Sequence, residues 1–467
     1  MGDSDEMGRA ELHARRAHRS FRRGQFSQAE QELRRALRFD PNRGDWRCNL
    51  AVTLELGGKH AEALVEYAAA ADLLNGHLDA HLGAARCAGT LGRHDDALRW
   101  ACSALEFDRL NEMAHAIQIE ALSHLGRHEE AEQAYFVCQQ YLDRYPWALR
   151  AMGDSLLRRG RHSRASWCFR EALTQAPDLE GGRVRLGMAL LAAGEAARAA
   201  QVFLQAIRAD PSDADALLGS GAALQQLGQT DAAAERFRRI LEMEPAHMGA
   251  HLRLAELAMS GGNFEEARAA FVVAISVGTP PAGARVRLAH CLLRLGDGDG
   301  ARTQLAEERA LPDFEARQAD LATTPALALE ATAVAVACKD FEFAQGVSTA
   351  ALAAHPVDLQ LLRRDCRISM EQGNLQLGLR KARRILRAHP TDAETLHNFA
   401  LAALKLRRPR WALAVLHRAR TAGLHERSLR AISTRLHLAH APALIAALGR
   451  SWGARLLAAL PFSAREN

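Results

Sequence analysis

Aromatic residues are scarce in this 467-residue sequence, which contains 6 Trp, 4 Tyr and 15 Phe. Proteins that bind single-stranded nucleic acids stack the bases on aromatic side chains, and a set of such platforms is not evident here. The sequence also lacks any run of 18 apolar residues, so a membrane-spanning helix is not expected. Its first six residues are polar and acidic, unlike the apolar core of a signal peptide. We therefore expect a cytoplasmic protein that does not bind membranes.

The eight cysteines are widely spaced, and no two of them form a Cys-x-x-Cys pair. Because such pairs hold zinc or form redox dithiols, neither is expected, and reduced cysteines should instead pack between helices. The sequence also contains no Gly-x-x-x-x-Gly-Lys-Ser/Thr phosphate loop, no Gly-x-Ser-x-Gly turn and no dinucleotide-binding fingerprint. These absences predict a protein that is not an enzyme and that uses no cofactor and no metal.

What the sequence does contain is a repeat of 34 residues. The period is marked by Gly24, Gly58, Gly92, Gly126, Gly160, Gly194, Gly228, Gly262 and Gly296. An alanine follows each glycine at the fifth position: Ala29, Ala63, Ala97, Ala131, Ala165, Ala199, Ala233, Ala267 and Ala301. A fixed period of this length indicates a stack of small units, each of which packs on its neighbours.

Each repeat is predicted to contain two helices, as residues 179–212 illustrate. Apolar residues recur at helical spacing over 181–193, and Gly194 ends this first helix with a left-handed backbone. A second helix follows over 195–209 and stops before Pro211. The small Ala199 lets the two helices cross closely. The aromatic residue four positions later is expected to fill the space between repeats, at Tyr67, Tyr135, Phe169, Phe203, Phe237 and Phe271.

Together with Leu186-Gly187 in a first helix, these positions resemble the tetratricopeptide repeat, a family of 34-residue helix-turn-helix units. The resemblance covers residues 10–311 in one register. It implies an all-α fold, a right-handed solenoid of about twelve repeats whose concave wall consists of first helices. It also implies a non-catalytic protein–protein interaction scaffold or adaptor.

The repeat predicts five regions along the chain. Residues 1–9 are expected to be disordered, and nine repeats in register follow over 10–311. The register slips at 312–324, an insertion that forms either a rigid bend or a hinge. Three weaker repeats occupy 325–424, where Lys339 and Arg407 replace two of the periodic glycines. Residues 425–467 are predicted to form helices that cap the apolar end of the stack or, alternatively, dock on a partner.

The resemblance implies a peptide-binding groove at the exposed positions of the first helices. We expect this groove to hold an extended or helical acidic segment of another protein, because arginines there can pair with carboxylates. The alternative is that these arginines are solvated or pair with Asp215 or Glu256. The predicted groove residues are Arg185, Leu218, Gln225, Leu252, Arg253, Met259, Val286, Arg287 and Arg294.

The C-terminal part of the chain is strongly basic, with 20 Lys/Arg against 6 Asp/Glu from Leu359 to Asn467. Such an asymmetry favours an acidic or polyanionic partner, so nucleic-acid association through phosphate contacts is an alternative function. A third hypothesis is self-assembly into a homo-oligomer through the ends of the stack. The predicted basic patch comprises Arg363, Arg367, Arg383, Arg384, Arg387, Asn398, Arg407 and Arg410.

The predicted register can be tested with Ala199→Leu. A leucine at this position would force the two helices of its repeat apart, and overpacking of this kind costs about 1–3 kcal/mol. We expect the variant to melt at a lower temperature than the parent protein when unfolding is followed by circular dichroism. An unchanged melting curve would contradict the register.

Overall fold

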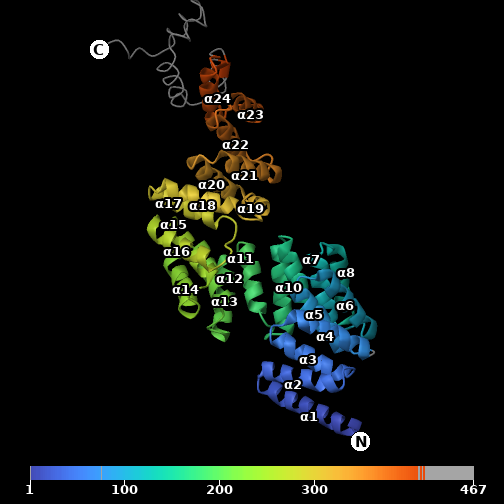
Figure 1. Ribbon diagram of the computed structural model, residues 1–467. Coiled ribbons are helices and arrows are strands. Elements are labelled where there is room, and N and C mark those ends of the chain that lie inside the picture. The colour runs from blue at the N-terminus through green and yellow to red at the C-terminus, as the bar shows by residue number, and fades with distance from the viewer. Residues whose placement is uncertain (1, 75, 409–410, 413, 416–467) are drawn as a thin grey trace, which may run out of the picture. The chain divides into compact units, whose positions relative to one another are not determined.

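The computed structural model describes residues 2–74, 76–408, 411–412 and 414–415 (Figure 1). These residues form 24 α-helices and no β-strand, which confirms the predicted all-α fold. The capping helices predicted at 425–467 lie outside the described residues. No described helix is by itself long and apolar enough to cross a membrane, although the bent pair Phe314–Leu321 and Pro325–Ala337 meets the length and composition criteria when taken together.

The chain divides after Met243 into two compact units. Unit 1 contains α1 (Gly2–Arg22), α2 (Phe26–Phe39), α3 (Gly44–Leu56), α4 (His60–Leu73), α5 (Leu78–Thr90), α6 (His94–Phe107), α7 (Glu112–His124), α8 (His128–Tyr141), α9 (Pro146–Arg158), α10 (His162–Gln175), α11 (Gly182–Ala192), α12 (Ala196–Ala209), α13 (Ala214–Gln226) and α14 (Thr230–Met243). Unit 2 contains α15 (Met248–Ser260), α16 (Phe264–Val277), α17 (Ala284–Arg294), α18 (Gly298–Arg309), α19 (Phe314–Leu321), α20 (Pro325–Ala337), α21 (Phe341–Ala354), α22 (Leu359–Glu371), α23 (Leu375–Ala388) and α24 (Ala393–Lys405).

Helices pair along the chain as the 34-residue repeat predicts. From α1 to α18, each odd-numbered helix is the first of its repeat and each even-numbered helix is the second. Within each unit, most consecutive helices pack side by side (Figure 1). The fold is therefore an all-α helical-repeat solenoid.

The beginning of the chain differs from the prediction. Residues 1–9 were expected to be disordered, but α1 begins at Gly2 and continues without interruption to Arg22. No proline interrupts this segment, and Ala10 and Ala17 are buried in the core of unit 1. The helical pattern of the first repeat therefore extends further toward the N-terminus than the apolar positions alone indicate.

The nine periodic glycines all have a φ between 68° and 88°. This left-handed region suits glycine, which has no Cβ to clash, and it commonly ends a helix. Beyond the insertion, Lys339, Gly373 and Arg407 occupy the same position, again 34 residues apart. Lys339 and Arg407 have φ values of 63° and 55°, and no other described non-glycine residue has a positive φ. The backbone requirement of the repeat therefore persists where the residue type changes.

The nine periodic alanines are at most 1% exposed, as a close crossing of two helices requires. After the insertion, Ala344 and Ala412 occupy the same position and are buried as well. At Gly378, the third such position, a Cβ atom would come within 2.5 Å of Met370 Cγ. Ala197 is exposed on α12, two residues before Ala199, so Ala197→Leu is the matched control for Ala199→Leu.

Aromatic rings join neighbouring repeats, as predicted. The fully buried ring of Phe203 on α12 lies against Gly187 of its own repeat and Gly219 of the next. A Cβ at Gly187 would approach Phe203 Cζ to 2.6 Å, and one at Gly219 would come closer still. The glycine in the Leu-Gly motif of the first helix is therefore explained by the space that this ring occupies.

The insertion predicted at 312–324 contains the short helix α19, which a buried ion pair ties to α18. Arg317 Nε donates to Glu308 Oε1 at 2.8 Å, and Arg317 Nη1 donates to the Pro280 carbonyl oxygen at 3.0 Å. The two charged side chains are 6% and 0% exposed. Removing one partner of such a buried pair leaves an uncompensated charge and is strongly destabilising. These contacts favour the rigid bend over the hinge.

The strained position of Lys339 can be tested by substitution. A left-handed conformation costs a residue with a Cβ roughly 1–2 kcal/mol, and glycine avoids this strain. Glycine also has more conformational freedom in the unfolded chain, which offsets part of the stabilisation. We expect Lys339→Gly to raise the free energy of unfolding by about 1 kcal/mol, measured by urea denaturation. Lys339→Ala, which keeps a Cβ, is the control and should give no such gain. Equal stabilisation by both variants would show that the backbone is not the cause.

Candidate functional site

The nine predicted groove residues lie on first helices, as expected, but they are divided between the two units. In unit 1, Arg185 is on α11, and Leu218 and Gln225 are on α13; all three are half-buried. In unit 2, Leu252, Arg253 and Met259 are on α15, and Val286, Arg287 and Arg294 are on α17. They therefore form two groups, one in each unit.

The apolar groove residues of unit 2 belong to its core. The prediction that Val286 lines a groove is wrong, because its side chain is 0% exposed. Leu82, Ala116 and Val184 at the same position of earlier repeats are buried as well, at 7–8% exposed, so this position faces the core in most repeats. Leu252 and Met259 are half-buried and pack against the hydrophobic cluster that includes Val286, which leaves little of their surface for a ligand.

The groove arginines of unit 2 are occupied by ion pairs. Arg253 Nη1 donates to Glu256 Oε2 at 3.0 Å, and Arg287 Nη1 donates to the other oxygen of the same carboxylate. Arg287 Nε lies 3.6 Å from Glu330, whose second oxygen is 3.0 Å from His290 Nδ1. Burial alone would raise the pKa of Glu330, but the contacts with His290 and Arg287 outweigh burial and lower it. The alternative of pairing with Glu256 thus holds for both arginines.

Arg294 lies outside this network, at the end of α17, and is exposed. Its guanidinium carbon is 4.7 Å from the ring centroid of Phe264 on α16. A cation–π contact at an exposed site contributes about 0.5–1 kcal/mol. Each predicted groove arginine of unit 2 therefore contacts a side chain of its own unit.

Unit 1 has a different arrangement, which we call the Arg150 cluster: Trp147, Arg150, Asp154 and Arg185. Arg185 Nε donates to Asp154 Oδ2 at 3.1 Å, and burial raises the pKa of this carboxyl group. The guanidinium carbon of Arg150 lies 4.7 Å from the Trp147 ring centroid. Arg150 is half-buried, and its Nε has no hydrogen-bond partner among the described residues. Burial and the nearby charge of Arg185 lower the pKa of Arg150.

Three members of this cluster, Trp147, Arg150 and Asp154, are not among the residues predicted from the sequence. Arg150 occupies the repeat position that Leu218, Leu252 and Val286 occupy later in the chain, and Asp154 occupies that of Glu256, so the 34-residue spacing could have found both. A second signal is the i, i+4 spacing of Arg150 and Asp154 on one helix face, with Trp147 one turn before Arg150. Arg185 pairs with Asp154 rather than with Asp215 or Glu256, the acidic residues that the sequence suggested.

Three of the eight residues of the predicted basic patch take part in internal contacts. Arg363 on α22 donates from Nε to Asp392 Oδ2 at 3.1 Å, and Arg367 donates to Glu371 at 2.6 Å. The guanidinium carbon of Arg383 lies 4.3 Å from the Trp411 ring centroid. Arg363 and Arg383 connect α22 and α23 to residues that follow them, and Arg367 pairs within α22, so the charge of these three arginines is only partly available to a partner.

The remaining members of the patch are more open. Arg384 and Arg387 on α23 and Arg407 after α24 are exposed and form no ion pair within the described part of the chain. Asn398 on α24 is half-buried, and Arg410 lies outside the described residues. Arg384 and Arg387 are three residues apart, so they share one helix face.

Metal and thiol chemistry find little support in the described residues. No three of their His, Cys, Asp or Glu side chains come together as a metal site. Seven of the eight cysteines are buried, and all eight are free. Burial raises the pKa of Cys87 to about 12 and that of Cys168 to about 11, which disfavours the reactive thiolate.

Charge reversal tests whether the unit 2 arginines support the fold. Arg253→Glu with Arg287→Glu would place two new carboxylates beside Glu256 and Glu330 and would remove their hydrogen-bond donors. We expect the free energy of unfolding to fall by about 1–3 kcal/mol, measured by urea denaturation.

The control for this experiment is Arg268→Glu on α16, whose pair with Glu265 is exposed and contributes little. If the double variant is as stable as the control, the two arginines do not hold the first helices together. They would then be available to a ligand, as the sequence first suggested.

Comparisons with known proteins agree with the repeat geometry. A family model described as "Tetratricopeptide repeat" matches residues 15–77, 150–214, 184–226, 218–282 and 259–313. No curated protein sequence matches the chain.

Several solved structures are similar over most of the chain. The APC/C hetero-tetramer Cut9–Hcn1 is 16% identical over 91% of this chain and 96% of that chain, with a TM-score of 0.42. Yeast Tom70 is 12% identical over 97% and 99%, with a TM-score of 0.36. The human IFIT1 dimer with m7Gppp-AAAA is 16% identical over 82% and 91%, with a TM-score of 0.47. Values this low carry no information on the partners of this chain. The left-handed glycines, buried alanines and family matches together show that the protein belongs to the tetratricopeptide-repeat family.

Proposed function

We propose that this protein is a non-catalytic scaffold that binds an acidic segment of a partner protein at the Arg150 cluster of unit 1. The tetratricopeptide-repeat fold supports a protein-interaction scaffold in general. The cytoplasmic location expected from the sequence is part of the same proposal. That the bound segment is acidic is a more specific proposal, and it is based on the absence of an ion pair at Arg150 within the described residues.

That observation is the unpaired guanidinium of Arg150. It is half-buried over Trp147 and forms no ion pair with any described residue, while Asp154 already accepts from Arg185. A donor that is removed from water without an acceptor costs about 1–3 kcal/mol. A carboxylate of a bound segment would supply the acceptor in the two-pronged geometry that guanidinium favours. The ring of Trp147 offers an apolar surface beside it.

The arginines on the first helices of unit 2 are less able to bind a carboxylate of a partner. There, Glu256 and Glu330 already satisfy Arg253 and Arg287. An incoming carboxylate would have to compete with two internal ones, so unit 1 is the better candidate for an acidic ligand.

A designed peptide tests the proposal. An eight-residue peptide of alternating Glu and Leu, labelled with fluorescein, is titrated with the full-length protein and followed by fluorescence anisotropy. Charge-assisted hydrogen bonds contribute about 1.5–3 kcal/mol, so we expect Arg150→Gln to weaken binding by roughly 10- to 100-fold. The matched control is Arg170→Gln, because Arg170 is exposed on α10 and has no ion pair among the described residues.

Two results would overturn the assignment. One is equal affinity of the Arg150→Gln and Arg170→Gln variants for the Glu–Leu peptide. The other is equal binding of a Gln–Leu peptide, which lacks the carboxylates. Circular dichroism of each variant establishes that helicity is retained, and light scattering of the same samples measures any self-association.

The basic patch supports nucleic-acid association as a second candidate. Its specific observation is the pair Arg384 and Arg387, which lie exposed on one face of α23 without ion pairs in the described structure. Phosphate contacts of this kind weaken steeply with salt. A single-stranded RNA probe that binds the parent protein but not Arg384→Gln with Arg387→Gln would favour this function. Binding unaffected by the substitutions would exclude the patch.

A further inference from the structure

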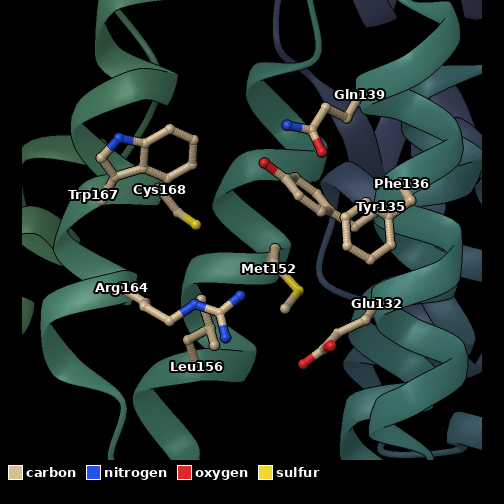
Figure 2. A pocket seen from close by; sticks show the side chains of 9 residues that line it. All are labelled: Glu132, Tyr135, Phe136, Gln139, Met152, Leu156, Arg164, Trp167 and Cys168. Atoms are coloured by element: carbon tan, nitrogen blue, oxygen red, sulfur yellow. The ribbon is translucent and has the colours of Figure 1, made fainter.

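A second candidate site lies on the other side of α9, where α8, α9 and α10 enclose a pocket of about 280 Å³. Figure 2 shows Phe136 of α8 and Trp167 of α10 on opposite sides of this pocket, with Met152 of α9 between them. Arg150 and Met152 are two positions apart on α9, which is about 200° around the helix axis. The pocket is therefore separate from the Arg150 cluster.

Both aromatic walls are unusually open to solvent. Phe136 is 56% exposed and Trp167 is 48% exposed, whereas the aromatic rings that join the repeats are buried. Large aromatic side chains that stand in water at the edge of a cavity are typical of the residues that dominate binding energy in protein interfaces. The fold gains little from leaving them there.

The repeat itself does not require aromatics at these two positions. Phe136 is ten residues after its periodic glycine, and Trp167 is seven residues after the next one. In the other seven neighbouring pairs of repeats, the same positions hold Arg34 and Val65, Ala68 and Arg99, Cys102 and Gln133, Arg170 and Gln201, Leu204 and Glu235, Arg238 and Ala269, and Val272 and Thr303. Among the nine repeats, aromatic residues occupy both positions at this one junction. The repeat fold therefore does not require them, and their role is specific to this pocket.

The charged groups around the pocket favour an anionic ligand. Arg164 on α10 is exposed and has no ion pair or hydrogen bond within the described residues. Glu132 on α8 is already occupied, because Arg159 Nη1 donates to it at 2.7 Å. The positive charge of Arg164 is thus available to a ligand, whereas the negative charge of Glu132 is neutralised by Arg159.

A buried hydroxyl group adds a second polar feature. Tyr135 is 8% exposed, and its hydroxyl group interacts with Tyr145 but forms no well-aligned hydrogen bond within the described residues. Burial, with a smaller effect of the nearby Tyr145, raises the pKa of Tyr135, so the group remains a neutral donor. In Figure 2 this hydroxyl lies beside the amide of Gln139, an exposed side chain that can move aside. A ligand that displaces Gln139 would offer this hydroxyl a better-aligned acceptor than Tyr145 does.

We propose that this pocket binds a segment of a partner protein in which a large apolar side chain stands next to an acidic residue. The apolar side chain would insert between Phe136 and Trp167 onto Met152, and the neighbouring carboxylate would pair with Arg164. The volume is below the range of about 300–1,000 Å³ that is typical of small-molecule sites and suits one side chain. The proposal is independent of the Arg150 cluster.

The probe is the acetylated hexapeptide Gly-Ser-Phe-Glu-Ser-Gly, titrated into the ¹⁵N-labelled full-length protein. The indole N–H resonance of Trp167, assigned by its loss in Trp167→Ala, is expected to shift saturably. A Phe-to-Ala version of the peptide should cause no shift. We expect Arg164→Gln to weaken binding of the parent peptide at least about fivefold, and to leave the already weaker binding of a Glu-to-Gln peptide unchanged.

Two variants serve as controls. Leu204→Ala removes an exposed apolar side chain from the position in α12 that corresponds to Phe136, where the facing residue is Glu235. It should bind like the parent protein. Arg164→Gln changes an exposed side chain without partners, so it tests the pocket even if Trp167→Ala lowers stability.

Three outcomes would overturn the proposal. The first is the absence of any shift of the Trp167 indole at millimolar peptide. The second is that Arg164→Gln weakens the binding of the Glu and Gln peptides equally. This result would show that Arg164 does not pair with the carboxylate of the peptide. The third is binding of free 3-phenylpropionate as tight as that of the peptide, which would make the pocket a site for small aromatic acids.

Discussion

The close crossing of two helices in each repeat is the constraint on which the rest of this structure depends. Nine alanines at the crossing are almost completely buried, and nine glycines turn the chain through the left-handed region to make the crossing possible. A buried ring such as Phe203 then occupies the space that Gly187 and Gly219 leave open and joins one repeat to the next. Because protein interiors are close-packed and leave little empty volume, the periodic alanine and glycine positions tolerate few residue types.

Since packing restricts only the inward positions, the outward positions of each repeat are free to differ, and their chemistry diverges between the units. On the first helices of unit 2, Arg253 and Arg287 share Glu256, and the charges balance internally. In unit 1, Arg150 is left half-buried without an ion pair in the described structure. Arg185 of unit 1 pairs with Asp154 as Arg287 of unit 2 pairs with Glu256, whereas Arg150 occupies the position that holds Val286 in unit 2.

The insertion shows how the solenoid tolerates a break in its period. Nine extra residues separate Gly296 from Lys339, beyond the 34 of one repeat, yet Lys339 adopts the same left-handed backbone as the glycine it replaces. The extra residues provide α19, and the buried pair of Arg317 and Glu308 fixes it to α18. Buried charges of this kind contribute little net stability when paired, but separating them is strongly unfavourable, so the pair favours a fixed position of α19 against α18.

The sequence by itself determined the all-α repeat fold, the register from residue 10 to 311 and the burial of its alanines and aromatic rings, because these follow from spacing along one chain. It did not determine which surface residues are available to a partner. Val286 is fully buried, Arg287 is paired with Glu256 of the preceding first helix, and Arg150 is left without an ion pair among the described residues. Pairing and enclosure depend on contacts between side chains about 30 to 40 residues apart. Such contacts are set by how neighbouring helices pack, so only the tertiary structure decided them.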